Sequence, residues 1–190
     1  GGTVNCKHLI AYRGLDDDFD ADNGFSGNIQ YALAVRDPNV ADVSGSNGFE
    51  SDNNAAGDGT KPKTKATFSN VTVIGPSGSA TVNSNYKRAA HLRRNTELGI
   101  FNSVEIGKYP VGILIDGDSA VNNAIAGRLS VRNSFFYGMT KLLDTTKVTV
   151  PFDINTWASG RAITTGSNAA DAGLVDPFNL ALPNPRPSAT

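Results

Sequence analysis

The sequence predicts an all-β fold, a parallel β-solenoid in which short strands coil around one axis. Three observations lead to this prediction: a repeat that relates the chain from Gly1 to the chain from Gly24, a second phrase that recurs at nearly constant spacing, and a scarcity of helix formers. The 190 residues include 20 Gly but only three Glu and one Met, and such a mixture favours strands and turns over helices. A chain of this length can form one domain with a substantial core.

The first repeat relates residues 1–13 to residues 24–36, on either side of an acidic run. A period in the twenties, built of strands with Gly and Asn at the corners, is typical of a solenoid. The positions that coincide or nearly coincide are Gly1/Gly24, Asn5/Asn28, Ile10/Leu33, Ala11/Ala34 and Arg13/Arg36.

The second repeated phrase is a polar corner, a short apolar strand and a glycine, found at residues 68–75, 101–107 and 132–138. Each copy is the unit expected for one rung of a solenoid, and the longer spacing leaves room for a loop in each turn. The rungs are expected to lie about 4.8 Å apart and to pair in parallel. Because Asn tolerates left-handed backbone, we expect the corner asparagines to stack and their amides to form a ladder. These are Asn70, Asn102 and Asn133.

The most strongly charged stretch is residues 15–27, which holds five Asp within seven positions. In an extended segment alternate side chains share a face, so four of these carboxylates would stand in one row about 7 Å apart. They are Asp16, Asp18, Asp20 and Asp22. An EF-hand is excluded because Ile29 stands where that loop needs a bidentate Glu. Two interpretations stay open, a solvated acidic turn and a calcium site of different geometry formed by this row.

A long polar passage, residues 41–65, is expected to be a loop. Its segment 47–52 repeats the order found in the acidic run, a small residue, then Phe, then two acids separated by one position. If the two segments stack one coil apart, they form a single acidic wall. Glu50 and Asp52 are therefore candidate ligand-binding residues.

The only basic cluster in the sequence spans residues 87–95. One expectation is that it neutralises acidic groups on a neighbouring turn. The other is that Arg93 or Arg94 holds a sugar carboxylate bidentately, a geometry that a guanidinium supplies. We count Arg93, Arg94 and His91 as candidate ligand-binding residues, and the two arginines as the candidate catalytic residues. Neither His91 nor His8 has a neighbouring Ser, Cys or His that would indicate a triad or a zinc site.

The sequence divides into coils over residues 1–175 and a proline-rich extended strap or linker over residues 176–190. Trp157 is expected to cover the open end of the stack, because terminal units of solenoids need covering. Cys6 is the single cysteine, so no internal disulfide is possible. The formal charge of −1 gives no reason to expect a nucleic-acid partner, and no apolar run approaches the roughly 20 residues of a transmembrane helix.

A set of phrases covers most of the chain and is specific when taken together. It comprises residues 1–9, 16–27, 47–53, 68–75, 92–95 and 176–180. Through these phrases the chain resembles a family of secreted or surface-anchored Bacteroidetes proteins with a right-handed parallel β-helix. The resemblance implies a right-handed helix, further coils before Gly1, and a chain that forms the C-terminal part of a longer helix.

In its fold this family is similar to pectate-lyase-like proteins, whose members often hold calcium with Asp and remove a proton with Lys or Arg. Two functions follow as expectations. The first is a non-catalytic module, secreted or on the outer cell surface, that binds polysaccharide or surface glycan or serves as a scaffold or adhesin. The alternative is a calcium-dependent polysaccharide lyase in which Asp18, Asp20 and Asp22 hold the ion. Arg93 or Arg94 would then serve as a clamp or as the base, and a pKa above 12 favours the clamp.

Overall fold

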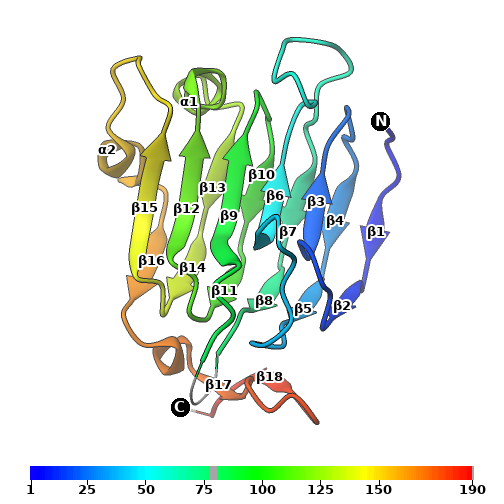
Figure 1. The fold of residues 1–190 in the computed structure, drawn as a ribbon, viewed down its shortest axis with the longest axis vertical. Helices are drawn as coiled ribbons and strands as arrows, with labels where there is room; N and C mark the ends of the chain where they lie inside the picture. The colour runs from blue at the N-terminus through cyan, green and yellow to red at the C-terminus, as the bar shows by residue number, and fades with distance from the viewer. Residues whose placement is uncertain (78–80, 190) are drawn as a thin grey trace.

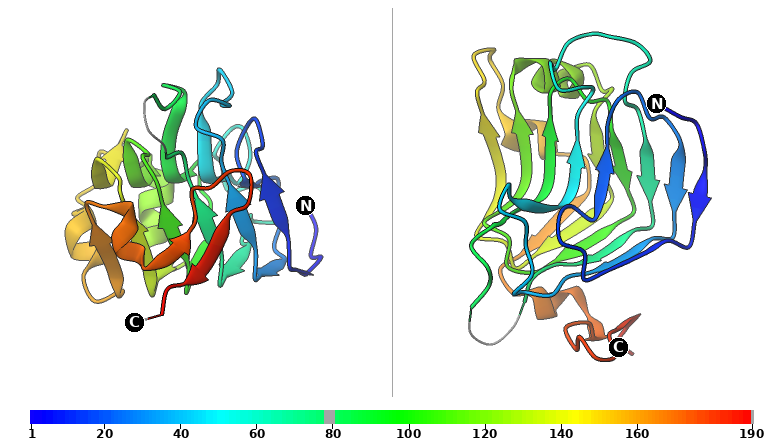
Figure 2. Two further views of the ribbon diagram at one scale, coloured as in Figure 1. Left: turned by 90° about the horizontal axis from the view of Figure 1, so that it is seen from below. Right: turned by 45° about the vertical axis from the view of Figure 1, so that its right-hand side comes forward.

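The chain winds through three parallel sheets, and each of the first five coils contributes one strand to each sheet, while the last turn adds β16 to the second sheet (Figure 1). This computed structural model describes residues 1–77 and 81–189. The strands of one sheet follow one another along the stack without crossing, so the right-handed parallel β-helix predicted from the sequence is confirmed (Figure 2). The N-terminus lies at one end of the stack and the last coil at the other.

The first sheet holds β1 (Cys6–Lys7), β4 (Asn28–Gln30), β7 (Thr67–Ser69), β10 (Gly99–Phe101) and β13 (Ser130–Arg132). The second holds β2 (Ile10–Tyr12), β5 (Leu33–Val35), β8 (Thr72–Ile74), β11 (Val104–Ile106), β14 (Ser134–Tyr137) and β16 (Ile163–Gly166). The third holds β3 (Phe19–Ala21), β6 (Ser46–Ser51), β9 (Tyr86–Arg93), β12 (Val111–Asp116) and β15 (Lys141–Thr146). Outside the sheets lie α1 (Asp118–Ile125), α2 (Ile154–Ala158), the 3-10 helix η1 (Ala169–Ala172), and the antiparallel pair β17 (Leu174–Asp176) and β18 (Asn184–Pro187).

The repeats found in the sequence set the register of the coils. Cys6 pairs with Ile29 and Ala11 with Ala34, at the same offset that relates Gly1 to Gly24 in the first repeat. The glycine exits also stack, because Gly75 donates its backbone N–H to Ile106 and Gly107 donates to Tyr137. At Gly107, φ is 132°, and an added Cβ would lie 2.8 Å from the carbonyl carbon of Gly75, so this close approach requires glycine.

The corner between the first and second sheets turns through one left-handed residue in every coil. Six residues with φ between 50° and 59° occupy this column: His8, Tyr31, Asn70, Asn102, Asn133 and Ala162. The amide of Asn133 donates to Oδ1 of Asn102 at 3.3 Å, and Gln30 donates to Oδ1 of Asn70 at 3.3 Å. The three predicted asparagines therefore do share one corner, and the expected amide ladder joins two of them.

The hydrophobic core fills the inside of the coils. Phe19, Phe49 and Phe68 meet there with ring centroids 5.1–5.7 Å apart, in tilted or edge-on arrangements that aromatic pairs prefer. Burying three phenyl groups in successive coils stabilises each strand against its neighbours by roughly 2 kcal/mol per ring. The core therefore ties successive coils together in addition to the strand pairing.

The sequence predicted one long loop over residues 41–65, but a strand interrupts this passage. Residues 46–51 within it form β6, because Phe49 is fully buried beside Phe19 and pairs with it in register. After β6 the chain leaves the stack over residues 54–63, because Asp52 and Asn53 before them and Thr64 and Lys65 after them still form backbone hydrogen bonds with neighbouring coils.

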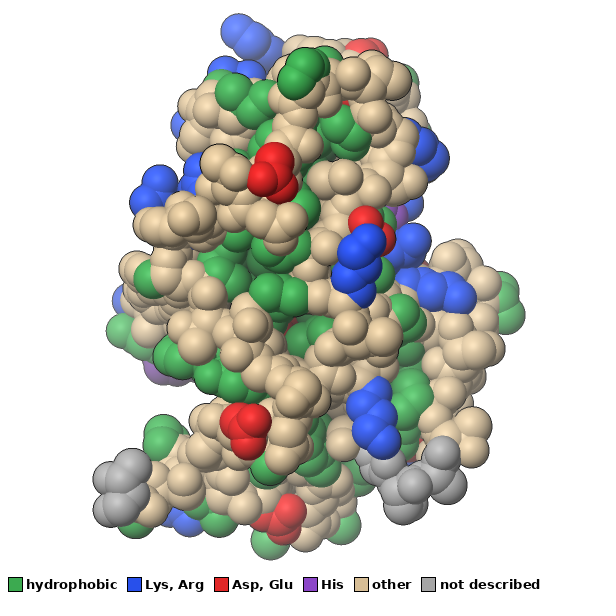
Figure 3. Space-filling view, turned by 90° about the vertical axis from the view of Figure 1, so that its left-hand side faces the viewer, with side chains coloured by type: hydrophobic (Ala, Val, Ile, Leu, Met, Phe, Trp, Pro, Cys, Tyr) green, Lys and Arg blue, Asp and Glu red, His purple; other side chains and the backbone are tan. Residues whose placement is uncertain are grey.

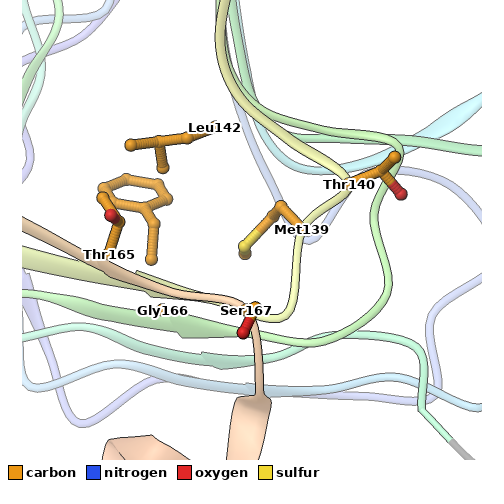
Figure 4. Close-up of a pocket in the computed structure, with 7 residues that line it drawn as sticks. Met139, Thr140, Leu142, Thr165, Gly166 and Ser167 are labelled. Carbon is orange, nitrogen blue, oxygen red and sulfur yellow. The ribbon is translucent and has the colours of Figure 1, made fainter.

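Trp157 lies in α2, which packs against β15 in the last coil, and only 8 % of its surface is exposed. It stacks beneath Arg161 at 4.6 Å and contacts Phe152, so it covers part of the open end as predicted. The end is not fully closed. Figure 3 shows hydrophobic side chains between polar ones on this side of the molecule. A cavity of about 330 Å³ opens there, and the part of its lining labelled in Figure 4 consists of Met139, Thr140, Leu142, Thr165, Gly166 and Ser167.

The C-terminal residues cross the outside of the second sheet as a strap. An apolar column formed by Val35, Ile74 and Ile106 faces outward at the end of that sheet. Side chains of the strap pack on this column: Leu174, Phe178 and Leu180. The Tyr12 hydroxyl donates to the backbone carbonyl of Leu180, so the strap reaches from the last coil to β2 in the first (Figure 2).

Replacing Asn102 tests the corner column. Asn102→Ala is expected to lower the free energy of unfolding by about 1–2 kcal/mol, because alanine must adopt the left-handed backbone and the amide ladder is lost. Asn102→Gly is the matched control, since glycine takes this conformation without a Cβ penalty, and should cost less. Chemical denaturation of the three proteins measures both losses. Equal losses in the two variants would show that backbone strain at this corner does not affect the free energy of unfolding.

Candidate functional site

The outward face of the third sheet gathers most of the charged residues that the sequence analysis singled out. Asp20, Glu50 and His91 pair in register on three adjacent strands, β3, β6 and β9. Their inward neighbours Phe19, Phe49 and Ala90 also pair, so the charged residues lie on the outer side by alternation. The acidic wall predicted from the two similar segments therefore exists.

Basic residues at the end of β9 and directly after it neutralise the acids one coil earlier. Arg93 donates from Nε and Nη2 to the two oxygens of Asp52, at 2.8 and 3.1 Å, and also to Glu50. Arg94 donates from Nη1 to Asp52 at 3.0 Å. The basic cluster therefore plays the neutralising role that was one of its two predicted roles, and Arg93 has its guanidinium engaged on two sides.

His91 bridges three coils. Its Nδ1 lies 3.2 Å from Glu50 Oε2, and its Nε2 lies 3.2 Å from Asp116 Oδ2 on β12. A neutral imidazole has one N–H, so only the doubly protonated ring donates to both carboxylates at once. The side chain is 4 % exposed, which places this bridge beneath the surface of the acidic wall.

The acidic run does not form the single row that alternation predicted. Only Phe19–Ala21 is a strand, and the residues before it bend. Asp18 turns into the interior and pairs with Arg36 at 3.2 Å, with both side chains fully buried, whereas Asp20 faces out. Asp22 accepts a hydrogen bond from Asn23, and Asp16 meets Arg36 through its backbone carbonyl.

The predicted calcium ligands therefore do not converge. Asp18 and Asp20 lie on opposite sides of the chain, and Asp18 already has a guanidinium partner. Among residues 1–77 and 81–189 no group of three or more His, Cys, Asp or Glu is arranged to hold a metal ion. The four carboxylates do not fit a calcium ion as they stand, and calcium binding by this run stays a prediction.

Neighbouring carboxyls on the acidic wall differ in their pKa values. Burial, together with the charge of Glu50, raises the pKa of Asp20 to about 6 and that of Asp17 to about 7. Burial also acts to raise the pKa of Glu50, but the hydrogen bond from His91 and the charge of Arg93 lower it overall. Glu50 is therefore held ionised beside Asp20 and Asp17, which keep their protons more readily.

A cavity of about 210 Å³ opens where this face meets the N-terminal end of α1. Two of its lining side chains are exposed cations, Arg94 at 44 % and Lys147 at 78 %. Lys147 lies 3.5 Å from Asp116, which also contacts His91. The lining residues are Ala56, Gly57, Arg93, Arg94, Asp116, Gly117, Ser119 and Lys147.

The five ligand-binding residues predicted from the sequence all lie in this network: Arg93, Arg94, His91, Glu50 and Asp52. Three residues of the cavity were not predicted: Asp116, Ser119 and Lys147. Lys147 follows Asp116 at the offset at which Asn133 follows Asn102, but that period does not hold in the third sheet. There Asp116 pairs with Thr146, and Lys147 lies one residue beyond the pair, so the repeated phrase gave no signal for this contact.

The comparisons with known proteins agree with this fold. The family model described as a pectate-lyase like beta helix domain matches residues 1–174. The chain belongs to this family. Membership in it fits a carbohydrate-related role. No curated protein and no solved structure matched the chain. Within the described residues, no helix combines the length and the apolar character that crossing a bilayer requires.

Asp52 is the main partner of both arginines, and its substitution tests the network. Asp52→Asn is expected to lower the free energy of unfolding by about 2 kcal/mol, because charge-assisted hydrogen bonds to two guanidinium groups are weakened. Asp144→Asn is the control, since Asp144 pairs with the exposed Lys141, and it should change stability by less than about 0.5 kcal/mol. Urea denaturation measures both. A loss for Asp52→Asn no larger than that of the control would contradict the network.

Asp17 gives a prediction about pH. Its pKa is about 7 in the folded protein and roughly 3.9 when unfolded, so it opposes folding increasingly as pH rises between these values. Asp17→Asn keeps an acceptor oxygen for Asn47 and removes the charge. We expect the variant to exceed the wild type in stability by about 1 kcal/mol at pH 8, after allowance for solvent screening, and by little at pH 4.

A control of opposite sign is available for this pH experiment. Hydrogen bonds from Thr60 and Asn54 lower the pKa of Asp58 to about 2, so Asp58→Asn should lose stability at pH 8. Melting temperatures at the two pH values distinguish these outcomes. A lower stability of Asp17→Asn at pH 8 would show that the carboxylate is favourable at this position.

Proposed function

We propose that this chain is a non-catalytic β-helix module, secreted or on the outer cell surface, that binds an acidic polysaccharide. The observation that carries the proposal is the cavity between β9, β12 and α1, in which two exposed cations, Arg94 and Lys147, face the same space. Membership in a pectate-lyase-like family supports a carbohydrate as the ligand.

The charges of the cavity favour an anionic sugar. Arg94 uses Nη1 to hold Asp52, which fixes the guanidinium and leaves its other N–H groups for a ligand carboxylate. Lys147 adds a second positive charge across the cavity. Its volume is below the roughly 300 Å³ of pockets that enclose drug-sized ligands, so it suits one sugar residue of a longer chain.

The state of the arginines supports binding over catalysis. Burial acts to lower the pKa of Arg93, but the hydrogen bond to Asp52 and the charges of Glu50 and Asp52 outweigh it and leave the pKa above its ordinary value. A guanidinium of this kind does not accept a proton from a sugar near neutral pH. The calcium-dependent lyase, the alternative expected from the sequence, also lacks support from the acidic run, whose carboxylates point in different directions.

One observation favours a second candidate function, glycoside hydrolysis. Asp20 and Glu50 pair in register on adjacent strands, and their pKa values are shifted in opposite directions. Such a pair matches the acid and base roles of glycosidases. Asp20 would be the general acid that supplies the proton, and Glu50 would be the ionised carboxylate that acts as base or nucleophile.

Binding is tested by titrating the protein with polygalacturonate and with a neutral glucan. We expect the acidic polymer to bind, and Arg94→Ala and Lys147→Ala each to weaken binding about tenfold, because each removes a charge-assisted contact. Lys141→Ala is the matched control on the same sheet and should bind like the wild type. Raised salt should weaken binding, since the cations are exposed.

The same incubations separate the candidates. Equal affinity for both polymers, or unchanged affinity in Arg94→Ala, would contradict the proposed module. Release of reducing sugar by the wild type and its loss in Asp20→Asn would favour the hydrolase instead.

A further inference from the structure

The interior of the helix contains a second set of polar residues that the proposed function does not use. Glu105 is the central residue of β11, where it pairs in register with Val73 and Phe136 and faces inward. It is fully buried, and among the described residues neither of its carboxyl oxygens has a hydrogen-bond partner. A buried carboxyl without a partner is costly, so it indicates a partner that the protein atoms do not supply.

Other unpartnered atoms gather around Glu105. Asp18 is close enough for its charge to act on both Glu105 and Tyr109, and its own Oδ2 has no partner within the described ranges. Among the same described residues, the hydroxyl of Tyr109 and Nε of Arg36 also lack hydrogen-bond partners. An added Cβ at Gly48 would lie 3.4 Å from Glu105 Oε2 and 2.6 Å from the carbonyl oxygen of Ala89, so β6 passes close to the carboxyl at a position that only glycine fits.

The remaining contacts hold these groups in place. Arg36 donates from Nη1 to the Gly14 carbonyl at 3.0 Å and to Asp18 at 3.2 Å. Its guanidinium lies 5.1 Å from the ring of Tyr86, which packs edge-on against Tyr109. The set therefore spans four coils, from the turn before β3 to the turn after β11, and every member is fixed from at least one side.

We propose that this interior holds a cluster of ordered water molecules that bridges Glu105, Asp18, Tyr109 and Arg36, with Glu105 carrying its proton. Buried water commonly satisfies polar groups of this kind by making two to four hydrogen bonds. Here water can accept from Arg36 Nε and the Tyr109 hydroxyl and can donate to Asp18 Oδ2, so one kind of ligand satisfies all of the unpartnered atoms.

A metal cation fits this site less well. Two of the unpartnered groups are donors, the Arg36 Nε–H and the Tyr109 O–H, and a cation cannot accept a hydrogen bond from them. The guanidinium also repels a cation. Among the described residues the site offers only two carboxyls, fewer than the several oxygens that a hard cation requires.

The proton on Glu105 follows from the balance of charge. Asp18 and Arg36 form an ion pair, so an ionised Glu105 would add an uncompensated negative charge to the interior. Burial, and then the charge of Asp18, raise the pKa of Glu105 well above its ordinary value. The other groups that face this site are Tyr86 and Tyr109, which contribute no positive charge.

Glu105→Gln tests the proton, because glutamine keeps the shape and the hydrogen-bonding capacity of the neutral acid. A raised folded pKa means that Glu105 opposes folding increasingly as pH rises above its unfolded value of roughly 4.3. The melting temperature of the wild type should therefore fall relative to that of Glu105→Gln by roughly 4 °C per pH unit above pH 5. Parallel pH profiles of the two proteins would overturn the assignment.

Two measurements on the wild type keep the proposal testable if the variant does not fold. Burial raises the pKa of both Asp17 and Asp18 to about 7, so infrared spectra at about pH 9, two units higher, should retain the carbonyl band of one protonated carboxyl, that of Glu105. Glu50→Gln should keep this band, since Glu50 is ionised. A crystal structure at high resolution should show water density between Glu105, Asp18 and Tyr109. Three outcomes would overturn the proposal. They are absence of the infrared band, absence of water density between these residues in the crystal structure, and a melting temperature that rises with sodium or potassium but not with choline.

Discussion

Parallel backbone pairing between successive coils is the constraint on which the rest of this structure depends. Each coil donates and accepts hydrogen bonds along three sheets, so residues in neighbouring coils lie about 4.8 Å apart at matching positions. The spacing in sequence between matched positions varies from 23 in the first coils, where Asn28 meets Asn5, to 41 where His91 on β9 meets Glu50 on β6. Loops absorb this variation, and the pairing of the strands stays in register.

This stacking brings like positions together on both faces of a sheet. On the outer face of the third sheet it places Asp20 beside Glu50, and the repulsion is relieved because the next coil supplies His91 and Arg93. The sequence of charges along the stack is acid, acid, base, acid, with Lys147 beyond. The charges that this network leaves exposed, on Arg94 and Lys147, are those available to a ligand.

Inside the coils the same stacking has to accommodate polar groups. The side chains of Asp18, Arg36 and Glu105 are among the most deeply buried, although charged side chains are rarely buried without partners. Their position links coils through polar contacts where the neighbouring core is aromatic and aliphatic. A network of this kind is stable only when every member is satisfied, which is why water and a proton matter to the integrity of the helix.

Sequence alone determined the repeats, because a solenoid repeats its local pattern in every coil. The offset of the first repeat, the corner asparagines and the stacking of Phe19-Asp20 on Phe49-Glu50 were all readable from residue order. The tertiary structure decided which way individual side chains turn. Arg13 and Arg36 are equivalent in the repeat, yet Arg13 is half-exposed beside Asp37 while Arg36 is buried against Asp18. Asp116 and Lys147 joined the site only through the pairing of β12 with β15 and the turn that follows each strand. Local pattern specifies where a strand lies, but the direction of a side chain at a bend depends on what the neighbouring coils place around it.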